Sequence, residues 1–245
     1  MKQLFESWRT YLNEVSGKSL ENYTTLISRE IVKALKDDGL RDHFNGSGQA
    51  QFKMEIGDIL DDLTWVRDVY IDLNAGNYVY SDAKYEFDLD ATDEQRADSD
   101  IIVNIVLPQG YDNSVFSDLI PELKDVLRHE LEHSSQPTDM LMNIQKEIPE
   151  GDVWKSLESA ETYYTDESET KAHVAGIYKK AKMLKEPAGE VMDDFLIKVW
   201  QTGMANGHSE EELSPLMKKI RSLWRNYMVS RYPHAEIDWE NEENI

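Results

Sequence analysis

Two histidines flank a short acidic segment, His129-Glu-Leu-Glu-His133. Residues four apart in a helix lie on one face, so His129 and His133 can bind one metal ion from the same side. Glu130 then stands close to a water molecule on that ion. Zinc lowers the pKa of such a water toward ~7, and a neighbouring carboxylate can take its proton. The spacing therefore predicts a hydrolytic site that holds one zinc ion per chain, with Glu130 as general base.

An apolar stripe precedes the motif and indicates how its helix is buried. The stripe is formed by Leu119, Ile120, Leu123, Val126 and Leu127. At about 100° per residue, His129 and His133 fall at the edge of the stripe, and Glu130 falls on the stripe itself. We therefore expect the site where the core meets a cleft.

Zinc also needs a third protein ligand, and the chain has no cysteine to supply it. Asp139 occupies the ligand position of the pattern H-E-x-x-H-x-x-G-x-x-H. Gln136 stands where that pattern has the glycine that makes a sharp turn, and this disfavours Asp139 as the ligand.

Glu169 is the preferred third ligand. It shares one helical face with Ala172 and Gly176, two small residues that let this helix approach another closely. Such an approach is needed to bring the carboxylate to the two histidines. Glu167 and Glu161 remain alternatives to Glu169.

The elements that must position these residues follow from hydrophobic periodicity. Helical spacing predicts amphipathic helices over 3–14 and 20–37, and the Gly, Ser and Asn content predicts a loop over 41–50. Strands are predicted near residues 52–56, 69–73, 78–80, 85–89 and 101–107. They form a small, mostly antiparallel sheet over 50–108, with 101–107 inside it because this strand is the most apolar.

From residue 115 onward the pattern is helical again. Proline positions and polar start signals predict four helices, about 118–136, 165–184, 188–204 and 209–233. Helices, then a sheet, then helices is an α+β order. We expect N-terminal helices over 1–48 and a catalytic domain over 49–245, with the sheet at 50–108 and a helical part at 115–235.

Composition excludes several classes of protein. The net charge of −22 disfavours binding to nucleic acid and to anionic membranes, because both repel an acidic surface. The absence of cysteine excludes disulfides, thiolate metal sites and cysteine nucleophiles. The longest apolar stretch, 101–107, is far too short to span a bilayer, and the N-terminus lacks the apolar centre of a secretory signal. These features predict a cytoplasmic protein.

The HELEH motif and the glutamate helix after it resemble the gluzincin family of HExxH zinc metallopeptidases. The resemblance covers about residues 100–183, where a strand, the motif helix and the glutamate helix follow in family order. It implies a zincin-like domain with His129, His133 and Glu169 as zinc ligands and Glu130 as general base. It also implies a peptide or protein substrate, bound in an extended form to an edge strand of the sheet.

The resemblance has one departure, four residues after the ligand glutamate. Thermolysin-like members have an aspartate there that supports the first histidine, whereas this chain has His173. Gluzincins often place a tyrosine or histidine donor against the developing oxyanion. Tyr163, Tyr164, His173 and His208 are candidates for this role, and the position of His173 one turn after Glu169 makes it the preferred catalytic donor.

The opening segment, residues 5–14, looks like the leaders of some tailed-phage proteins. Leu12-x-Glu14 is similar to the L-x-E site that prohead proteases of large myophages cut. This resemblance implies a phage-encoded protein that loses residues 1–14 and is found in the host cytoplasm or the virion.

An alternative from another class of function is an acidic binding or inhibitor protein that mimics DNA. Its metal site would then be structural or vestigial. The acidic residues are spread evenly along the chain rather than gathered on one helix face, which does not favour this alternative.

Overall fold

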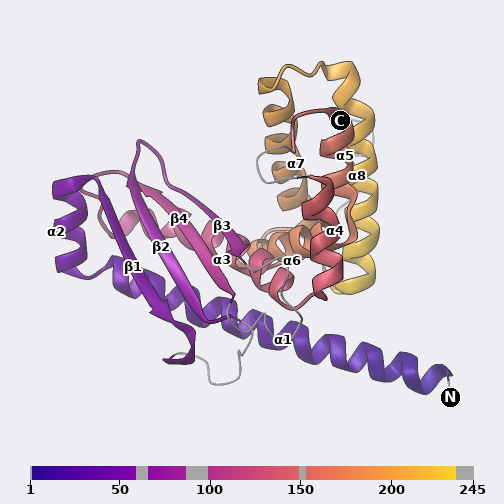
Figure 1. The fold of residues 1–245 in the computed structure, drawn as a ribbon, viewed down its shortest axis with the longest axis horizontal. Coiled ribbons are helices and arrows are strands. Elements are labelled where there is room, and N and C mark those ends of the chain that lie inside the picture. Colours follow the sequence, from indigo (N-terminus) through magenta and orange to yellow (C-terminus); the bar gives the residue numbers. More distant parts are fainter. Residues whose placement is uncertain (1, 59–65, 87–98, 149–152, 236–245) are drawn as a thin grey trace. The chain divides into compact units, whose positions relative to one another are not determined.

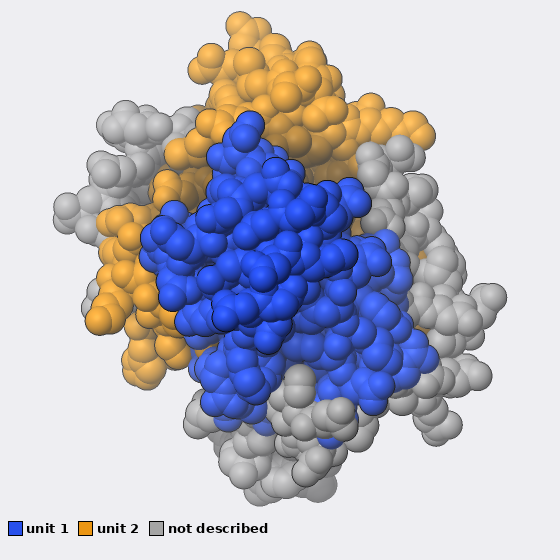
Figure 2. Space-filling model, turned by 90° about the vertical axis from the view of Figure 1, so that its left-hand side faces the viewer, with its two compact units in different colours: residues 1–88, 94–134 blue, residues 89–93, 135–245 orange. Residues whose placement is uncertain are grey.

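The computed structural model describes residues 2–58, 66–86, 99–148 and 153–235. N-terminal helices precede a four-stranded sheet, and a helical half follows it (Figure 1), which confirms the predicted α+β class. The chain divides into two compact units (Figure 2). Unit 1 contains residues 1–88 and 94–134, and unit 2 contains residues 89–93 and 135–245. The predicted division into N-terminal helices (1–48) and a catalytic domain (49–245) stays a prediction.

Unit 1 begins with α1 (Lys2–Leu35), one continuous helix where the sequence predicted two. α2 (Asp38–Ser47) follows, and it shows that the predicted loop over 41–50 was wrong. The side chain of Asp37 accepts the N–H of Leu40 at 3.1 Å, and Gly48 ends the helix with a φ of 74°. These two caps stabilise a helix that contains residues more common in turns.

The sheet has the strand order β1 (Gln49–Glu55), β2 (Asp68–Ala75), β4 (Asp100–Leu107), β3 (Tyr80–Glu86). β1 pairs with β2 and β3 with β4 in the antiparallel sense, while β2 and β4 are parallel. The sheet is therefore mostly antiparallel, and β4 is an interior strand, as predicted. Residues 87–89 of the predicted strand 85–89 lie outside the described residues.

Alternate residues of the strands face the core of unit 1. In β4 the fully buried residues are Ile101, Val103, Ile105 and Leu107. After β4 the chain forms a single 3-10 turn (Asn113–Val115), whose start is capped by the side chain of Asp112, and then α3 (Phe116–Ser134). α3 contacts both α1 and β3. Its leucines at positions 119, 123, 127 and 131 are fully buried, so the predicted apolar stripe anchors the motif helix.

Unit 2 is helical. It contains α4 (Thr138–Glu147), α5 (Leu157–Thr165), α6 (Glu167–Leu184), α7 (Ala188–Ala205) and α8 (Glu210–Arg231). The sequence predicted α6, α7 and α8 but neither α4 nor α5. The core joins α5 through α8 around the fully buried Trp224. Within the described residues no helix combines the length and the apolar character needed to cross a bilayer.

Candidate metal centre

The motif residues lie near the C-terminal end of α3, after the four buried leucines. Glu130 and His133 are only 6% and 7% exposed, and His129 is half-buried. A buried glutamate is uncommon unless a partner or an ion compensates its charge. The helical-wheel expectation for Glu130 therefore agrees with its position in the structure.

The two imidazole rings converge. The Nε2 atoms of His129 and His133 are 3.0 Å apart, and the ring centroids are 4.7 Å apart with the planes inclined at 77°. Two nitrogens that bind one tetrahedral zinc at about 2.0–2.1 Å must be about 3.3 Å apart. The pair is thus close to the spacing that a shared metal ion requires, and both residues belong to unit 1.

Glu130 lies next to this pair. Its Oε1 atom is 3.8 Å from Nε2 of His129. A carboxylate at this distance from a ligand nitrogen can reach a water molecule that binds the same ion.

A second ion pair stands beside the motif on α3, and the sequence analysis did not identify it. Arg128 Nη1 donates to Glu132 Oε2 at 2.6 Å, and Arg128 is only 2% exposed. Each partner precedes one of the two histidines by one residue. The spacing of four residues between opposite charges was the signal that could have revealed it.

Glu169 lies in the first turn of α6, in unit 2. Asp166 caps this helix, and its Oδ1 accepts the N–H of Ser168 at 2.7 Å and that of Glu169 at 3.4 Å. Glu169 is buried, as are the small residues Ala172 and Gly176 on the same face. Glu169 Oε2 is 3.9 Å from Nε2 of His173, one turn further along.

Aromatic rings surround His173. The indole of Trp224 stacks on the imidazole with centroids 4.8 Å apart and planes 24° apart. Phe195, Tyr164 and Tyr163 follow at 5.1, 5.8 and 6.0 Å. Trp224 is itself held by the hydrogen bond from its Nε1 to the carbonyl oxygen of Tyr164, at 2.9 Å. These contacts fix the orientation of the imidazole.

Besides His173, Tyr164 is a candidate for the hydrogen-bond donor to the oxyanion. Burial raises the pKa of Tyr164 to about 12, a hydrogen bond with Trp154 lowers it, and the negative charge of Glu169 raises it further. The phenol is therefore protonated at every physiological pH and can donate a hydrogen bond. Because Glu169 affects its pKa, Tyr164 lies within electrostatic range of that carboxylate.

The other predicted candidates have different surroundings. Asp139 is exposed, and its Oδ1 accepts the N–H of Met140 in the first turn of α4. Glu167 is exposed and forms an ion pair with Lys171 at 2.6 Å, and Glu161 forms one with Lys219. His208 is half-buried, with its ring 5.9 Å from that of Trp154. Among the four candidate acids, Glu169 alone is buried.

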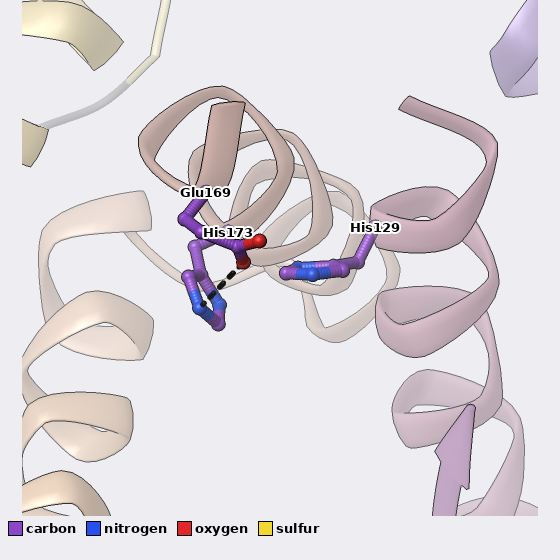
Figure 3. A group of neighbouring side chains, drawn as sticks. All are labelled: His129, Glu169 and His173. Atoms are coloured by element: carbon purple, nitrogen blue, oxygen red, sulfur yellow. Dashed lines mark ion pairs between the residues drawn. The ribbon is translucent and has the colours of Figure 1, made fainter. Parts of the chain in front are cut away.

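Among the described residues, His129, Glu169 and His173 form a group that could hold a metal ion, because each offers one ligand atom (Figure 3). His133 is not part of this group. Imidazole and carboxylate ligands suit zinc, and they also suit other divalent transition metals. The group contains His173, which the sequence analysis assigned to oxyanion stabilisation rather than to metal binding. The spacing of four residues between Glu169 and His173, equal to that of the two motif histidines, was the available signal.

The chain was compared with protein-family models, with curated proteins and with solved structures. None of these comparisons finds a match.

Proposed function

We propose that this protein is a zinc-dependent metallopeptidase of the gluzincin type, with His129, His133 and Glu169 as zinc ligands and Glu130 as general base. The observation that carries the proposal is the pair of Nε2 atoms 3.0 Å apart, with the buried Glu130 carboxylate beside them. A metal ion bound by both nitrogens would explain why the two rings converge. A water molecule on that ion would explain why a carboxylate that can accept a proton is buried beside them.

Zinc, when bound, acts as a Lewis acid toward the attacking water and the scissile carbonyl. Glu130 would accept a proton from the attacking water and donate it to the leaving nitrogen. His173 donates a hydrogen bond to the oxygen on which negative charge develops, and Tyr164 can serve in the same way. The rings around His173 keep its imidazole oriented, so little reorganisation is needed when the charge forms.

The fold of unit 1 offers a place for an extended substrate. β3 pairs with β4 on one side only, and no other described strand pairs with it. A peptide that adds to a free strand edge forms backbone hydrogen bonds along its length. β3 also contacts α3, the helix that carries the motif. The family resemblance and the edge position together support a peptide substrate.

A digest of casein or of a peptide library, with and without a chelator, tests the function. Cleavage that the chelator abolishes and zinc restores supports the proposal. A stability loss on chelation without any cleavage would instead support the acidic binding or inhibitor protein with a structural metal. Full cleavage in the presence of chelator would contradict zinc catalysis.

The role of His173 needs a separate test, because the same imidazole could bind the metal. His173→Ala should retain one zinc per chain and lower kcat if the residue is a hydrogen-bond donor. Loss of zinc from this variant, to the extent seen in His129→Ala, would make His173 a ligand instead.

A further inference from the structure

The edge strand β3 presents two kinds of side chain alternately. Ser81 and Tyr85 are buried on the core side of the sheet, whereas Tyr80 and Asp82 face solvent. An extended chain that pairs with the edge of β3 opposite β4, where no other described strand pairs, would therefore pass beside Tyr80 and Asp82.

Two aromatic side chains stand exposed at the start of β3. Tyr78 is 64% exposed and Tyr80 is 46% exposed, and their rings meet edge to face with centroids 6.4 Å apart. Exposed, adjacent aromatic rings offer π-faces that attract Lys and Arg side chains. The pair is thus suited to a cationic side chain with an aliphatic stem.

Two acidic residues accompany the tyrosines. Burial raises the pKa of Tyr80, and the negative charges of Asp82 and Glu122 raise it further, so both carboxylates lie within electrostatic range of its hydroxyl group. Asp82 is held at the strand, because its Oδ1 accepts the N–H of Ala83 at 2.9 Å. Glu122 lies on α3, two helical turns before His129 and on the same face.

The acidic side chains of β3 outnumber its bases. Lys84 is the one base of β3, and it forms an ion pair with Glu86 at 2.5 Å. The whole chain carries a net charge of −22, which attracts cationic molecules and repels anionic ones. Aromatic faces, two carboxylates and an acidic field all favour the same kind of side chain.

We propose that Tyr78, Tyr80, Asp82 and Glu122 form a subsite for a Lys or Arg side chain of an extended peptide that pairs with β3. This inference rests on the proposed peptidase function and names its substrate class: basic peptides or basic segments of proteins. The guanidinium or ammonium group lies between the two carboxylates, and its stem packs on the tyrosine rings.

Binding can be measured without turnover. Zinc-loaded Glu130→Gln protein is titrated with fluorescein-labelled peptides that are identical except for Arg, Gln or Glu at the tested positions, and anisotropy gives Kd. We expect the Arg peptide to bind roughly ten-fold more tightly than the Gln peptide, and the Glu peptide to bind weakest. Raising the salt concentration should reduce this difference.

The subsite is tested by Asp82→Asn and Glu122→Gln added together to the same protein. The asparagine keeps an oxygen acceptor for the N–H of Ala83, so the strand is preserved. We expect affinity for the Arg peptide to fall about five- to ten-fold, with affinity for the Gln peptide unchanged. The matched control is Glu210→Gln with Glu211→Gln, two exposed acids at the start of α8, which removes the same charge elsewhere.

Tyr80→Leu should lower affinity for the Arg peptide more than for the Gln peptide, because leucine keeps the apolar area and loses the π-face. Equal losses in the β3 variants and the α8 control, or no preference for the Arg peptide, would overturn the subsite. Cleavage of peptides without any charge preference would reject the subsite and leave the peptidase intact. Charge-selective binding by a wild-type protein that cleaves nothing would reject the peptidase and leave the subsite intact.

Discussion

Glu130 carries most of the proposed chemistry at the scale of single residues. Its buried carboxylate lies 3.8 Å from Nε2 of His129, the nitrogen proposed to bind zinc. Arg128, two positions before Glu130 in sequence, forms an ion pair with Glu132. Because Glu130 is not one of the proposed zinc ligands, its removal should affect turnover rather than metal binding.

Glu130→Gln should lower kcat/KM at least 100-fold, because the amide cannot accept the proton, while zinc content stays at one per chain. Peptide hydrolysis and metal analysis of the same preparation give both quantities. Glu211→Gln, which changes an exposed acid on α8, serves as the control. Turnover by Glu130→Gln at the level of this control would remove Glu130 from the mechanism.

Tyr164 gives a prediction about pH and stability. Its pKa is about 12 in the folded protein, above the ~10 of an unfolded chain, so the phenol keeps its proton to a higher pH in the folded state. The contribution of this proton to stability is complete below pH 10 and is lost as the pH rises from about 10 to 12. Between pH 10 and 12 the free energy of unfolding of the wild-type protein should therefore fall by roughly 2–3 kcal/mol more than that of Tyr164→Phe.

Urea unfolding of both proteins at a series of pH values up to 12 measures this difference. Parallel curves for the two proteins above pH 10 would show that Tyr164 is not the group whose proton is retained.

At the scale of elements, α3 and α6 each contain an ion pair of opposite charges four residues apart, with the same separation of 2.6 Å. Arg128 and Glu132 on α3 are largely buried, whereas Glu167 on α6 is exposed. Removing one member of a buried pair leaves a charge without compensation, whereas an exposed pair contributes little. The two helices thus provide a matched comparison.

Glu132→Ala should lower the free energy of unfolding by about 3 kcal/mol, and Glu167→Ala by less than about 1 kcal/mol. Denaturation in the presence of chelator measures both changes apart from any effect on metal binding. Equal losses in the two variants would mean that burial of Arg128 does not set the contribution of its ion pair.

The helices also show which parts of the fold local sequence patterns can predict. The spacing of the histidines and the leucine stripe predicted α3 and the side of it that bears the motif, because both depend on local periodicity. The pattern failed for α2, where the caps at Asp37 and Gly48 outweigh a turn-like composition. It also missed α4 and α5, which are only 10 and 9 residues long.

The surroundings of His173 lie beyond such patterns. Its closest ring partners, Phe195 and Trp224, are 22 and 51 residues away in sequence and reach it only through the packing of α6, α7 and α8. Tertiary contacts of this kind leave no local periodicity. The same holds for the metal-binding potential of His173, for which the sequence offered only the spacing from Glu169.

For the whole molecule, zinc binding should be coupled to folding. A ligand that binds only the folded protein stabilises it, by about 2.7 kcal/mol at a free concentration 100 times its Kd. Addition of zinc to metal-free protein should therefore raise Tm, and a chelator should reverse the change. His129→Ala should remove most of this shift, while the exposed His43→Ala should leave it intact. A shift that persists in His129→Ala would place the stabilising ion elsewhere.

The position of a bound ion tests the central claim most directly. Crystals grown with zinc, measured on both sides of the zinc absorption edge, locate the ion by its anomalous scattering. The account predicts one strong peak about 2.0–2.1 Å from Nε2 of both His129 and His133, with the Glu130 carboxylate facing a water molecule on the ion. A structure in which these two rings point apart, or in which the peak lies away from them, would contradict it.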